Sequence, residues 1–185
     1  MDWPHQGKVS FKDVSLRYRP KTALVLKDLT FEIEPGQKIG ICGRTGAGKS
    51  TIALTLSRII ELEKGTIEID GIDISSLDLK DLRSKITVIP QDPTLFKGTL
   101  KFNLDPFNSL DDEKLKEVLL KAGLNNLLGR GEKQFGNGLE FRIDEGGSNL
   151  SVGEKQLLCI CRSILRQNKV VILDEATANI DVVTE

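Results

Sequence analysis

The sequence predicts an α/β protein, and three observations support this fold class. Apolar and polar residues alternate with a period of two over residues 8–18 and 26–34, as in strands with one exposed face. An apolar run at residues 38–42 leads through glycines into a segment with helical spacing, which is how a buried parallel strand meets a helix. A second apolar run, at residues 170–173, follows an amphipathic helix and is expected to be another buried strand.

The other elements of the first half follow in order. Pro35-Gly36 indicates a turn after the second strand. Beyond the glycine loop, the pattern predicts a strand over residues 66–71, a short helix over 78–85 and a strand over 86–92. Residues 49–60 are predicted to form a helix whose apolar face consists of Ile52, Leu56, Ile59 and Ile60.

The second half is more helical. Residues 111–123 have its clearest helical pattern, with Gly123 as the C-terminal cap, and the glycine-rich residues 129–147 are expected to be a connector. A further helix is expected to begin at Ser151, because Ser151 and Glu154 have the spacing of a capping box. Its apolar face is predicted to consist of Leu157, Ile160, Cys161, Ile164 and Leu165.

Length and composition restrict the class of protein. A chain of 185 residues is long enough for an α/β domain with its own core. The formal net charge of −1, with charges interspersed, gives no reason to expect nucleic acid as a partner. No run approaches the roughly 18 apolar residues that span a bilayer, so we expect no direct membrane insertion of this segment. Cys42, Cys159 and Cys161 lie in apolar stretches and are expected to be reduced and buried.

A glycine-rich loop carries the strongest chemical signal. Residues 43–51 read GRTGAGKST and satisfy the pattern G-x-x-x-x-G-K-[ST] of the Walker A phosphate-binding loop, or P-loop. Glycines let backbone amides turn toward phosphates, and the following helix adds its partial positive charge. Lys49 is expected to reach the β- and γ-phosphates, and the Ser50 hydroxyl to bind Mg²⁺. The binding residues are predicted to be Gly43, Arg44, Thr45, Gly46, Ala47, Gly48, Lys49, Ser50 and Thr51.

An acidic pair at the end of the last apolar run supplies the second half of such a site. Asp174 directly follows the predicted strand and is expected to hold Mg²⁺, directly or through water. Glu175 is the next residue and can accept a proton from an attacking water. By itself, an apolar run that ends in Asp-Glu is more often a strand that meets a loop. The phosphate-binding loop makes the catalytic interpretation the better one.

Three motifs occur in an order typical of one family: the phosphate-binding loop, NLSVGEKQ at residues 149–156, and VVILDE at residues 170–175. In this order the chain resembles the nucleotide-binding domain of ATP-binding cassette (ABC) transporters over nearly its whole length. Residues 3–20 and 98–108 look like the second nucleotide-binding domain of subfamily C, the multidrug-resistance-associated proteins. The resemblance implies a P-loop NTPase fold of ABC type, in which a mixed core sheet is joined by an antiparallel β subdomain and a helical subdomain.

The resemblance also implies roles that spacing alone leaves open. Tyr18 matches the aromatic residue that stacks on adenine, although by itself it reads as a surface tyrosine at a strand end. Gln91 matches the glutamine that contacts Mg²⁺ and the attacking water and that responds to the transmembrane part. Glu175 matches the catalytic base, and Asp181 the aspartate of a loop that crosses the dimer interface. The implied catalytic set is Glu175, Lys49 and Gln91, and the implied Mg²⁺ ligands are Ser50, Gln91 and Asp174.

Residues 150–154, LSVGE, match the family signature, which usually has glutamine at the position of Glu154. The resemblance places Ser151, Gly153 and Glu154 in a nucleotide-binding segment that contacts the γ-phosphate of an ATP held by the opposite domain. A capped helix start with glycine does offer bare amides to an anion. Glutamate preserves the capping box but brings a negative charge near a phosphate. Two outcomes stay open: Glu154 weakens ATP binding in the paired site, or its side chain turns away.

The implied domain is expected to be incomplete at its C-terminus, because family members carry a γ-phosphate-contacting histidine well beyond the catalytic glutamate and this sequence ends at Glu185. We expect one ABC nucleotide-binding domain over residues 1–185. Its catalytic core and β subdomain are assigned to residues 8–90 and 165–185, and its helical subdomain with the signature to residues 91–164. The isolated chain is expected to bind Mg-ATP poorly or moderately and to hydrolyse it slowly.

The leading hypothesis is an ATPase, with ATP and Mg²⁺ as cofactors, that powers substrate export through a membrane transporter. Two such domains would close on two ATP molecules, so the implied partners are a second nucleotide-binding domain, in the same or another chain, and transmembrane domains. The implied location is the cytoplasmic face of a membrane. One alternative is a nucleotide sensor that gates a channel or a partner without transport. Another is a cassette protein that acts on ribosomes or DNA, which fits the near-neutral charge badly.

Overall fold

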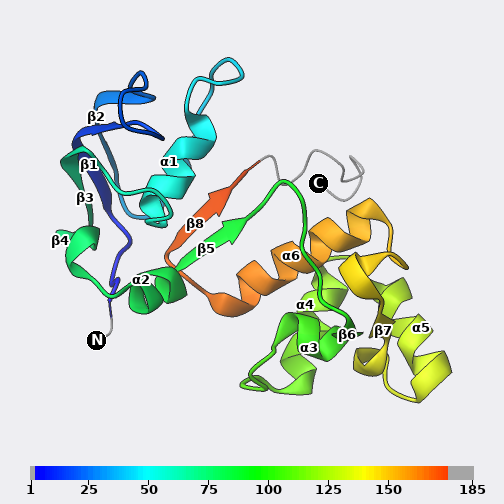
Figure 1. Cartoon of the computed structure of the whole chain (residues 1–185). Coiled ribbons are helices and arrows are strands. Elements are labelled where there is room, and N and C mark those ends of the chain that lie inside the picture. The colour runs from blue at the N-terminus through cyan, green and yellow to red at the C-terminus, as the bar shows by residue number, and fades with distance from the viewer. Residues whose placement is uncertain (1–2, 175–185) are drawn as a thin grey trace. The chain divides into compact units, whose positions relative to one another are not determined.

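The computed structural model describes residues 3–174 (Figure 1). The chain divides into two compact units. Unit 1 comprises residues 1–87 and 168–172, and unit 2 comprises residues 88–167 and 173–185. No helix of the described part is long and apolar enough to cross a membrane. The described helices and strands are, in chain order, β1 (Val9–Leu16), β2 (Leu26–Ile33), α1 (Lys49–Leu56), β3 (Lys64–Ile69), β4 (Ile72–Asp73), α2 (Leu79–Lys85), β5 (Ile86–Ile89), β6 (Gly98–Thr99), α3 (Leu100–Leu104), α4 (Asp112–Lys121), α5 (Asn125–Phe135), β7 (Arg142–Ile143), α6 (Val152–Arg166) and β8 (Val170–Leu173).

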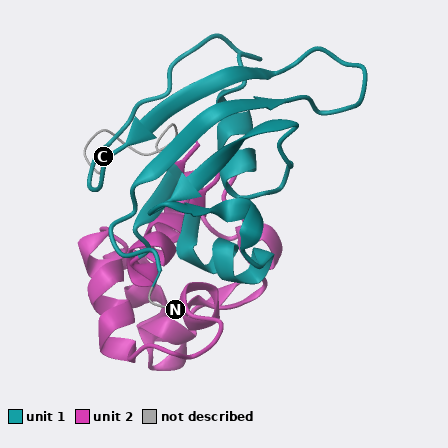
Figure 2. Cartoon of the chain, turned by 90° about the vertical axis from the view of Figure 1, so that its left-hand side faces the viewer, with its two compact units in different colours: residues 1–87, 168–172 teal, residues 88–167, 173–185 magenta. Residues whose placement is uncertain are grey.

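Unit 1, teal in Figure 2, is built on an antiparallel four-stranded sheet in the order β2-β1-β3-β4. Phe11 on β1 lies opposite Phe31 on β2, and the two rings stack with centroids 4.5 Å apart. On the other side of β1, Phe11 lies opposite Ile67 of β3. Both pairings shift register beside Asp13, whose φ of 50° marks a bulge. The sheet confirms the predicted antiparallel β subdomain.

Unit 1 has its own hydrophobic core. Trp3 joins it from the N-terminal side, where its indole N–H donates to the carbonyl of Ile69 at 3.0 Å. The predicted turn is present, because the amide of Gln37 donates to the carbonyl of Glu34 at 3.1 Å. The core consists of Trp3, Val9, Phe11, Val14, Leu16, Leu26, Leu56, Ile67, Ile69, Ile74, Leu82, Ile86 and Val170.

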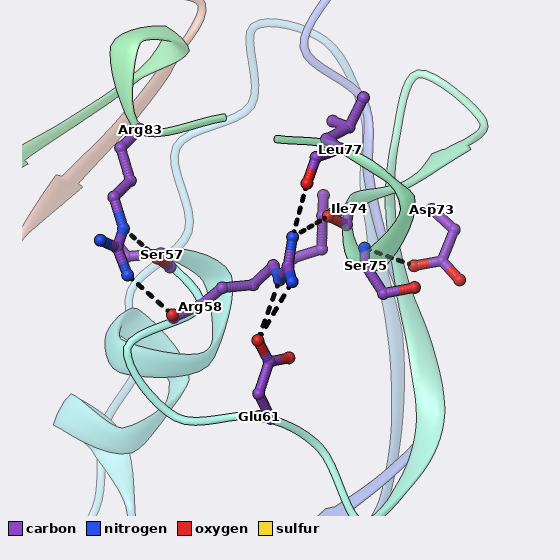
Figure 3. A network of polar contacts seen from close by, with 8 residues as sticks. All are labelled: Ser57, Arg58, Glu61, Asp73, Ile74, Ser75, Leu77 and Arg83. Carbon is purple, nitrogen blue, oxygen red and sulfur yellow. Dashed lines mark hydrogen bonds and ion pairs between the residues drawn. The ribbon is translucent and has the colours of Figure 1, made fainter. Parts of the chain in front are cut away.

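Arg58 fixes the chain beyond α1 (Figure 3). Its guanidinium donates to the carbonyls of Ile74 and Leu77 at 3.0 and 2.8 Å and pairs with Glu61 at 3.1 Å. Ile74 begins a short 3₁₀ turn, Ile74–Ser76, so the contacts connect α1 to the segment after β4. Arg83 of α2 adds to this network, donating to the carbonyls of Ser57 and Arg58 at 3.1 and 2.9 Å.

This network corrects the predicted length of the first helix. α1 ends at Leu56 rather than at residue 60, because the chain turns at Arg58, which has a φ of 46°. Ile59, which the helical stripe placed on the buried face, is 62% exposed. Helical spacing therefore did not predict burial beyond Leu56, because the backbone is no longer helical there.

Unit 2, magenta in Figure 2, is mainly helical and has a second core. Its β6 and β7 form a short antiparallel pair with Gly98 opposite Ile143. α4 confirms the predicted helix, and Gly123 follows it with a φ of 76°, as expected of a C-terminal glycine. The core consists of Leu95, Leu100, Leu104, Leu115, Val118, Leu119, Leu124, Leu127, Leu139, Phe141, Ile143, Leu150, Leu158, Cys161 and Leu165.

β5 and β8 form a separate two-stranded sheet. Asn168, just before β8, donates to the carbonyl of Ser84 at 3.1 Å and to the hydroxyl of Thr87 at 2.9 Å. The last apolar run is thus a strand, as predicted. It is not fully buried, since Val171 and Leu173 are 41% and 59% exposed.

Residues 38–42 are not the buried strand that the apolar run predicted. They have no strand conformation, Ile39 and Ile41 are 51% and 45% exposed, and Cys42 is exposed, unlike the buried Cys159 and Cys161. An apolar run becomes a strand only when a neighbouring strand accepts and donates its backbone hydrogen bonds. Within residues 3–174, β5 and β8 pair with each other and no strand pairs with this run.

Two predictions for unit 2 also change. The expected connector over residues 129–147 begins as helix, because α5 extends through Phe135. Its remainder holds two 3₁₀ turns, Gly138–Glu140 and Glu145–Gly147, and β7. The buried face of α6 also includes Leu158 and Cys159, which were not predicted to lie on it. Ile164, which was predicted to lie on the buried face, is 50% exposed. The helix contacts two clusters, which bury Leu158, Cys159, Cys161 and Leu165.

Candidate nucleotide site

The loop before α1 has the backbone geometry that its glycines suggested. Gly46 and Gly48 have φ values of 79° and 89°, which residues with a side chain rarely adopt. Gly48 is the N-cap of α1, and no side chain of the described residues caps the helix there. A Cβ on Gly48 would lie 3.2 Å from Cδ2 of Leu26, so glycine also lets the loop pack on β2. The first amides of α1 are therefore open to an external anion.

Lys49 lies across this loop. Its ammonium donates to the carbonyls of Gly43 and Arg44 at 2.8 and 3.2 Å, which holds a positive charge beside the uncapped helix start. Ser50 follows and is exposed. Open amides, one ammonium and one hydroxyl fit the acceptor oxygens of a polyphosphate and a Mg²⁺ ion attached to it. The residues of the loop thus suit the predicted ligand.

Tyr18 is positioned beside the same loop. Its hydroxyl forms a hydrogen bond of 2.7 Å with the hydroxyl of Thr51, in the first turn of α1. Thr51 is only 3% exposed, whereas Tyr18 is 54% exposed. The tyrosine ring is therefore accessible while its hydroxyl is anchored. The base-stacking role of Tyr18 and the nucleotide-binding role of Thr51 stay predictions.

Gln91 lies in the exposed segment that follows β5. The chain just beyond it is anchored by Asn103 of α3, whose side chain accepts from the amide of Phe96 at 2.9 Å and donates to its carbonyl at 2.8 Å. Arg162 of α6 joins this network through Nη2, at 2.8 Å from Oδ1 of Asn103, and through Nη1, at 2.7 Å from the carbonyl of Thr94. The segment of Gln91 and the signature helix are thus connected by one half-buried arginine.

Asp174 lies at the end of β8. Its amide donates to the carbonyl of Ile89, the last residue of β5, at 3.0 Å. Since Gln91 comes two residues after Ile89, the two predicted Mg²⁺ ligands of unit 2 follow adjacent strand ends. No cluster of three or more His, Cys, Asp or Glu side chains that could hold a metal occurs in the described part of the chain.

The signature segment begins α6 with the predicted capping box. The Ser151 hydroxyl accepts from the amide of Glu154 at 3.1 Å, and Oε2 of Glu154 accepts from the amide of Ser151 at 2.8 Å. Gly153 lies between them in the first turn. The cap uses one carboxylate oxygen of Glu154.

The other oxygen of Glu154 has a partner that the sequence did not reveal. Oε1 accepts from Nη2 of Arg130, on α5, at 2.8 Å. The guanidinium of Arg130 also lies 4.8 Å from the centre of the Phe141 ring. Arg130 and Arg162 are two residues near the predicted site that sequence reasoning missed. Neither belongs to a motif, and Arg130 precedes Glu154 by 24 positions.

The predicted site residues fall into both units. Tyr18 and residues 43–51 belong to unit 1, whereas Gln91, Ser151, Gly153, Glu154 and Asp174 belong to unit 2. Glu175 and Asp181 lie outside the described residues. Burial raises the pKa of the Cys159 thiol and raises the pKa of the Cys161 thiol to about 12. The roles of all these residues in nucleotide binding stay predictions.

Comparison with known proteins places these features in context. The family model described as ABC transporter matches residues 26–178. The chain is 49% identical over 183 residues to human ATP-binding cassette sub-family C member 3, and 49% identical over 182 residues to ABC transporter C family member 13 of Dictyostelium discoideum. These matches cover 99% and 98% of the chain, but the chain spans only 12% and 13% of the length of the two relatives.

A solved structure is also similar in fold. The structure of a bacterial Atm1-family ABC exporter with ATP bound superposes with a TM-score of 0.88 at 31% sequence identity. The match covers 97% of this chain and 31% of the exporter chain. The similarity therefore includes residues of both units.

Proposed function

Because this chain belongs to the ABC transporter family, with a P-loop NTPase fold and a resemblance to subfamily C, we propose that it is an ATPase domain driving substrate export. One observation carries the proposal. In the loop of residues 43–51, the ammonium of Lys49 lies beside the uncapped start of α1. That arrangement suits the β- and γ-phosphates of ATP.

Unit 1 supplies the binding chemistry. Lys49 and the loop amides neutralise phosphate charge, and the exposed ring of Tyr18 stacks on adenine, with its hydroxyl held by Thr51. Ser50, Gln91 and Asp174 would hold Mg²⁺, which would supply further charge neutralisation. Phosphoryl transfer depends mainly on such positioning and charge stabilisation.

Hydrolysis needs a base beside the attacking water. Glu175 accepts a proton from that water, whose oxygen bonds to the γ-phosphorus while the bond from this phosphorus to the bridging oxygen breaks. The products are ADP and inorganic phosphate. Gln91 orients the water, and the adjacency of the β5 and β8 ends supports placing Gln91 near Asp174.

The second half of the cycle involves another domain. Ser151, Gly153 and the open amides at the start of α6 contact the γ-phosphate of an ATP on a second nucleotide-binding domain, and Asp181 lies in the loop that crosses the interface. The segment around Gln91 transmits the nucleotide state to transmembrane domains at the cytoplasmic face of a membrane. Nucleotide-driven dimerisation is thus part of the proposal.

Substitution of the base tests this proposal. E175Q removes the proton acceptor but keeps the size of the side chain, so ATP hydrolysis by the full chain should fall by about 100-fold or more. ATP binding should remain, and MgATP should accumulate an associated form that gel filtration with light scattering detects. K49M is the matched control, and we expect it to lose both binding and association.

Three results would count against the proposal. Unchanged hydrolysis in E175Q would show that Glu175 is not the base. Unchanged nucleotide affinity in K49M would show that the loop is not the binding site. ATP-dependent association of the wild-type chain without any hydrolysis would favour a nucleotide sensor over a transport ATPase.

A further inference from the structure

Glu154 occupies the signature position at which the family usually has an uncharged glutamine. The structure accounts for both of its oxygens. Oε2 accepts from the amide of Ser151 at 2.8 Å, and Oε1 accepts from Nη2 of Arg130 at 2.8 Å. The carboxylate is therefore fixed by two hydrogen bonds, one of which is an ion pair.

Arg130 is itself held in place by its surroundings. Its guanidinium lies over the Phe141 ring, 4.8 Å from the centroid, and Phe141 is only 5% exposed. A cation over an aromatic face is attracted by the ring electrons. Its Nε is buried, with no hydrogen-bond partner among the described residues. Within that part of the chain, the side chain thus has one strong polar partner, Glu154.

The balance of charge at this helix start decides whether a phosphate can approach. A carboxylate in the first turn stabilises the helix but repels an incoming anion. The Arg130 side chain is 41% exposed and that of Glu154 24%, so screening by water is incomplete. A cation at 2.8 Å cancels the monopole of the carboxylate and leaves the local charge close to that of glutamine.

We propose that Arg130 is a positioning residue that neutralises Glu154 and holds it in the capping box, keeping the start of α6 suited to a nucleotide phosphate on a second domain. Arg130 acts through Glu154 and Phe141, and it needs no contact with ATP. The inference rests on the proposed function, because that function supplies the nucleotide phosphate. The ion pair between Arg130 and Glu154 does not depend on it.

A double-substitution cycle tests the inference. In the E175Q chain, R130M leaves the carboxylate unpaired and should weaken MgATP-dependent association by about tenfold or more. Adding E154Q to R130M removes the charge that needed a partner, so association should return to nearly the E175Q level. R130K keeps the charge and should retain most of the association. K133M, which removes an exposed lysine from the same helix, is the control and should change little.

The alternative explanation is that Arg130 only stabilises the fold by packing on Phe141. In that case R130M would weaken association equally with and without E154Q, and the inference would be wrong. If two E175Q chains do not associate in the presence of MgATP at all, the proposed function fails before this inference is tested. Urea unfolding then tests the ion pair between Arg130 and Glu154 by itself. R130M must lower the free energy of unfolding more in the chain that keeps Glu154 than in the chain that carries E154Q. Equal losses would overturn the inference.

Discussion

Gly131 has no side chain, and this lets the backbone of α5 lie against the backbone at Gly138. A Cβ at this position would lie 2.3 Å from the carbonyl oxygen of Gly138 and 2.9 Å from its carbonyl carbon. Backbone atoms cannot move aside as the end of a flexible side chain can. We therefore predict that G131A lowers the free energy of unfolding by about 1–3 kcal/mol. Urea unfolding of the full chain, followed by circular dichroism, measures this change.

Gly129 provides the control for that prediction. It lies in the same helix, and a Cβ there would meet no atom within 4 Å. G129A should raise the free energy of unfolding by about 0.5–1 kcal/mol, because alanine loses less backbone entropy on folding. If G131A proved as stable as G129A, α5 and the turn at Gly138 would not be in close contact.

Residues within a motif could be predicted from the sequence. The residues that contact them from distant parts of the chain could not. The pattern of residues 43–51 located the glycines and Lys49, and the spacing of Ser151 and Glu154 located the capping box. Arg130 could not be found this way, because no periodicity links it to Glu154. The ion pair between Glu154 and Arg130 is a tertiary contact, which a short stretch of sequence does not contain. The effect of Glu154 on ATP binding stays a prediction.

At the scale of the element, α6 depends on its cap. Ser151 and Glu154 satisfy each other's backbone amides at 3.1 and 2.8 Å. We predict that S151A lowers the free energy of unfolding by about 1 kcal/mol, because the first turn loses the acceptor for the Glu154 amide. Urea unfolding measures the loss, and faster amide exchange confined to the first turn of α6 would locate it.

Ser163 is the matched serine inside the same helix. Within the described residues, its side chain makes no hydrogen bond that S163A would remove. Alanine is also the better helix former, so S163A should leave the free energy of unfolding unchanged or slightly higher. Equal losses in S151A and S163A would show that the cap contributes nothing beyond helix propensity.

Elements with a self-contained signal were predicted well, and those that need a partner strand were not. The alternation of β1 and β2 and the amphipathic pattern of α4 are local properties, so each appears where it was expected. Residues 38–42 have an equally clear apolar run but no strand conformation. Their hydrogen-bond partners must come from another part of a sheet, which a short window of sequence does not encode.

At the scale of the whole molecule, the alternation and the apolar runs predicted the α/β class, and the order of the motifs predicted the ABC-type fold. The family match and the exporter structure bear out both. The two large hydrophobic clusters coincide with the two units. Residues of unit 1, from Trp3 to Val170, form one core, and residues of unit 2, from Leu95 to Leu165, form another. Because each unit buries its own apolar side chains, each has its own source of stability.

These separate cores lead to a prediction about cooperativity. Leu82 lies in the core of unit 1 and Leu158 in that of unit 2, and both are 0% exposed. Truncation of either to alanine should cost about 2–5 kcal/mol. We predict that L82A accelerates amide hydrogen exchange in β1 and β3 and leaves α4 protected, whereas L158A does the reverse. Exchange of the full chain, resolved by mass spectrometry of peptides, measures both patterns, and equal acceleration throughout by either variant would show that the two cores unfold as one.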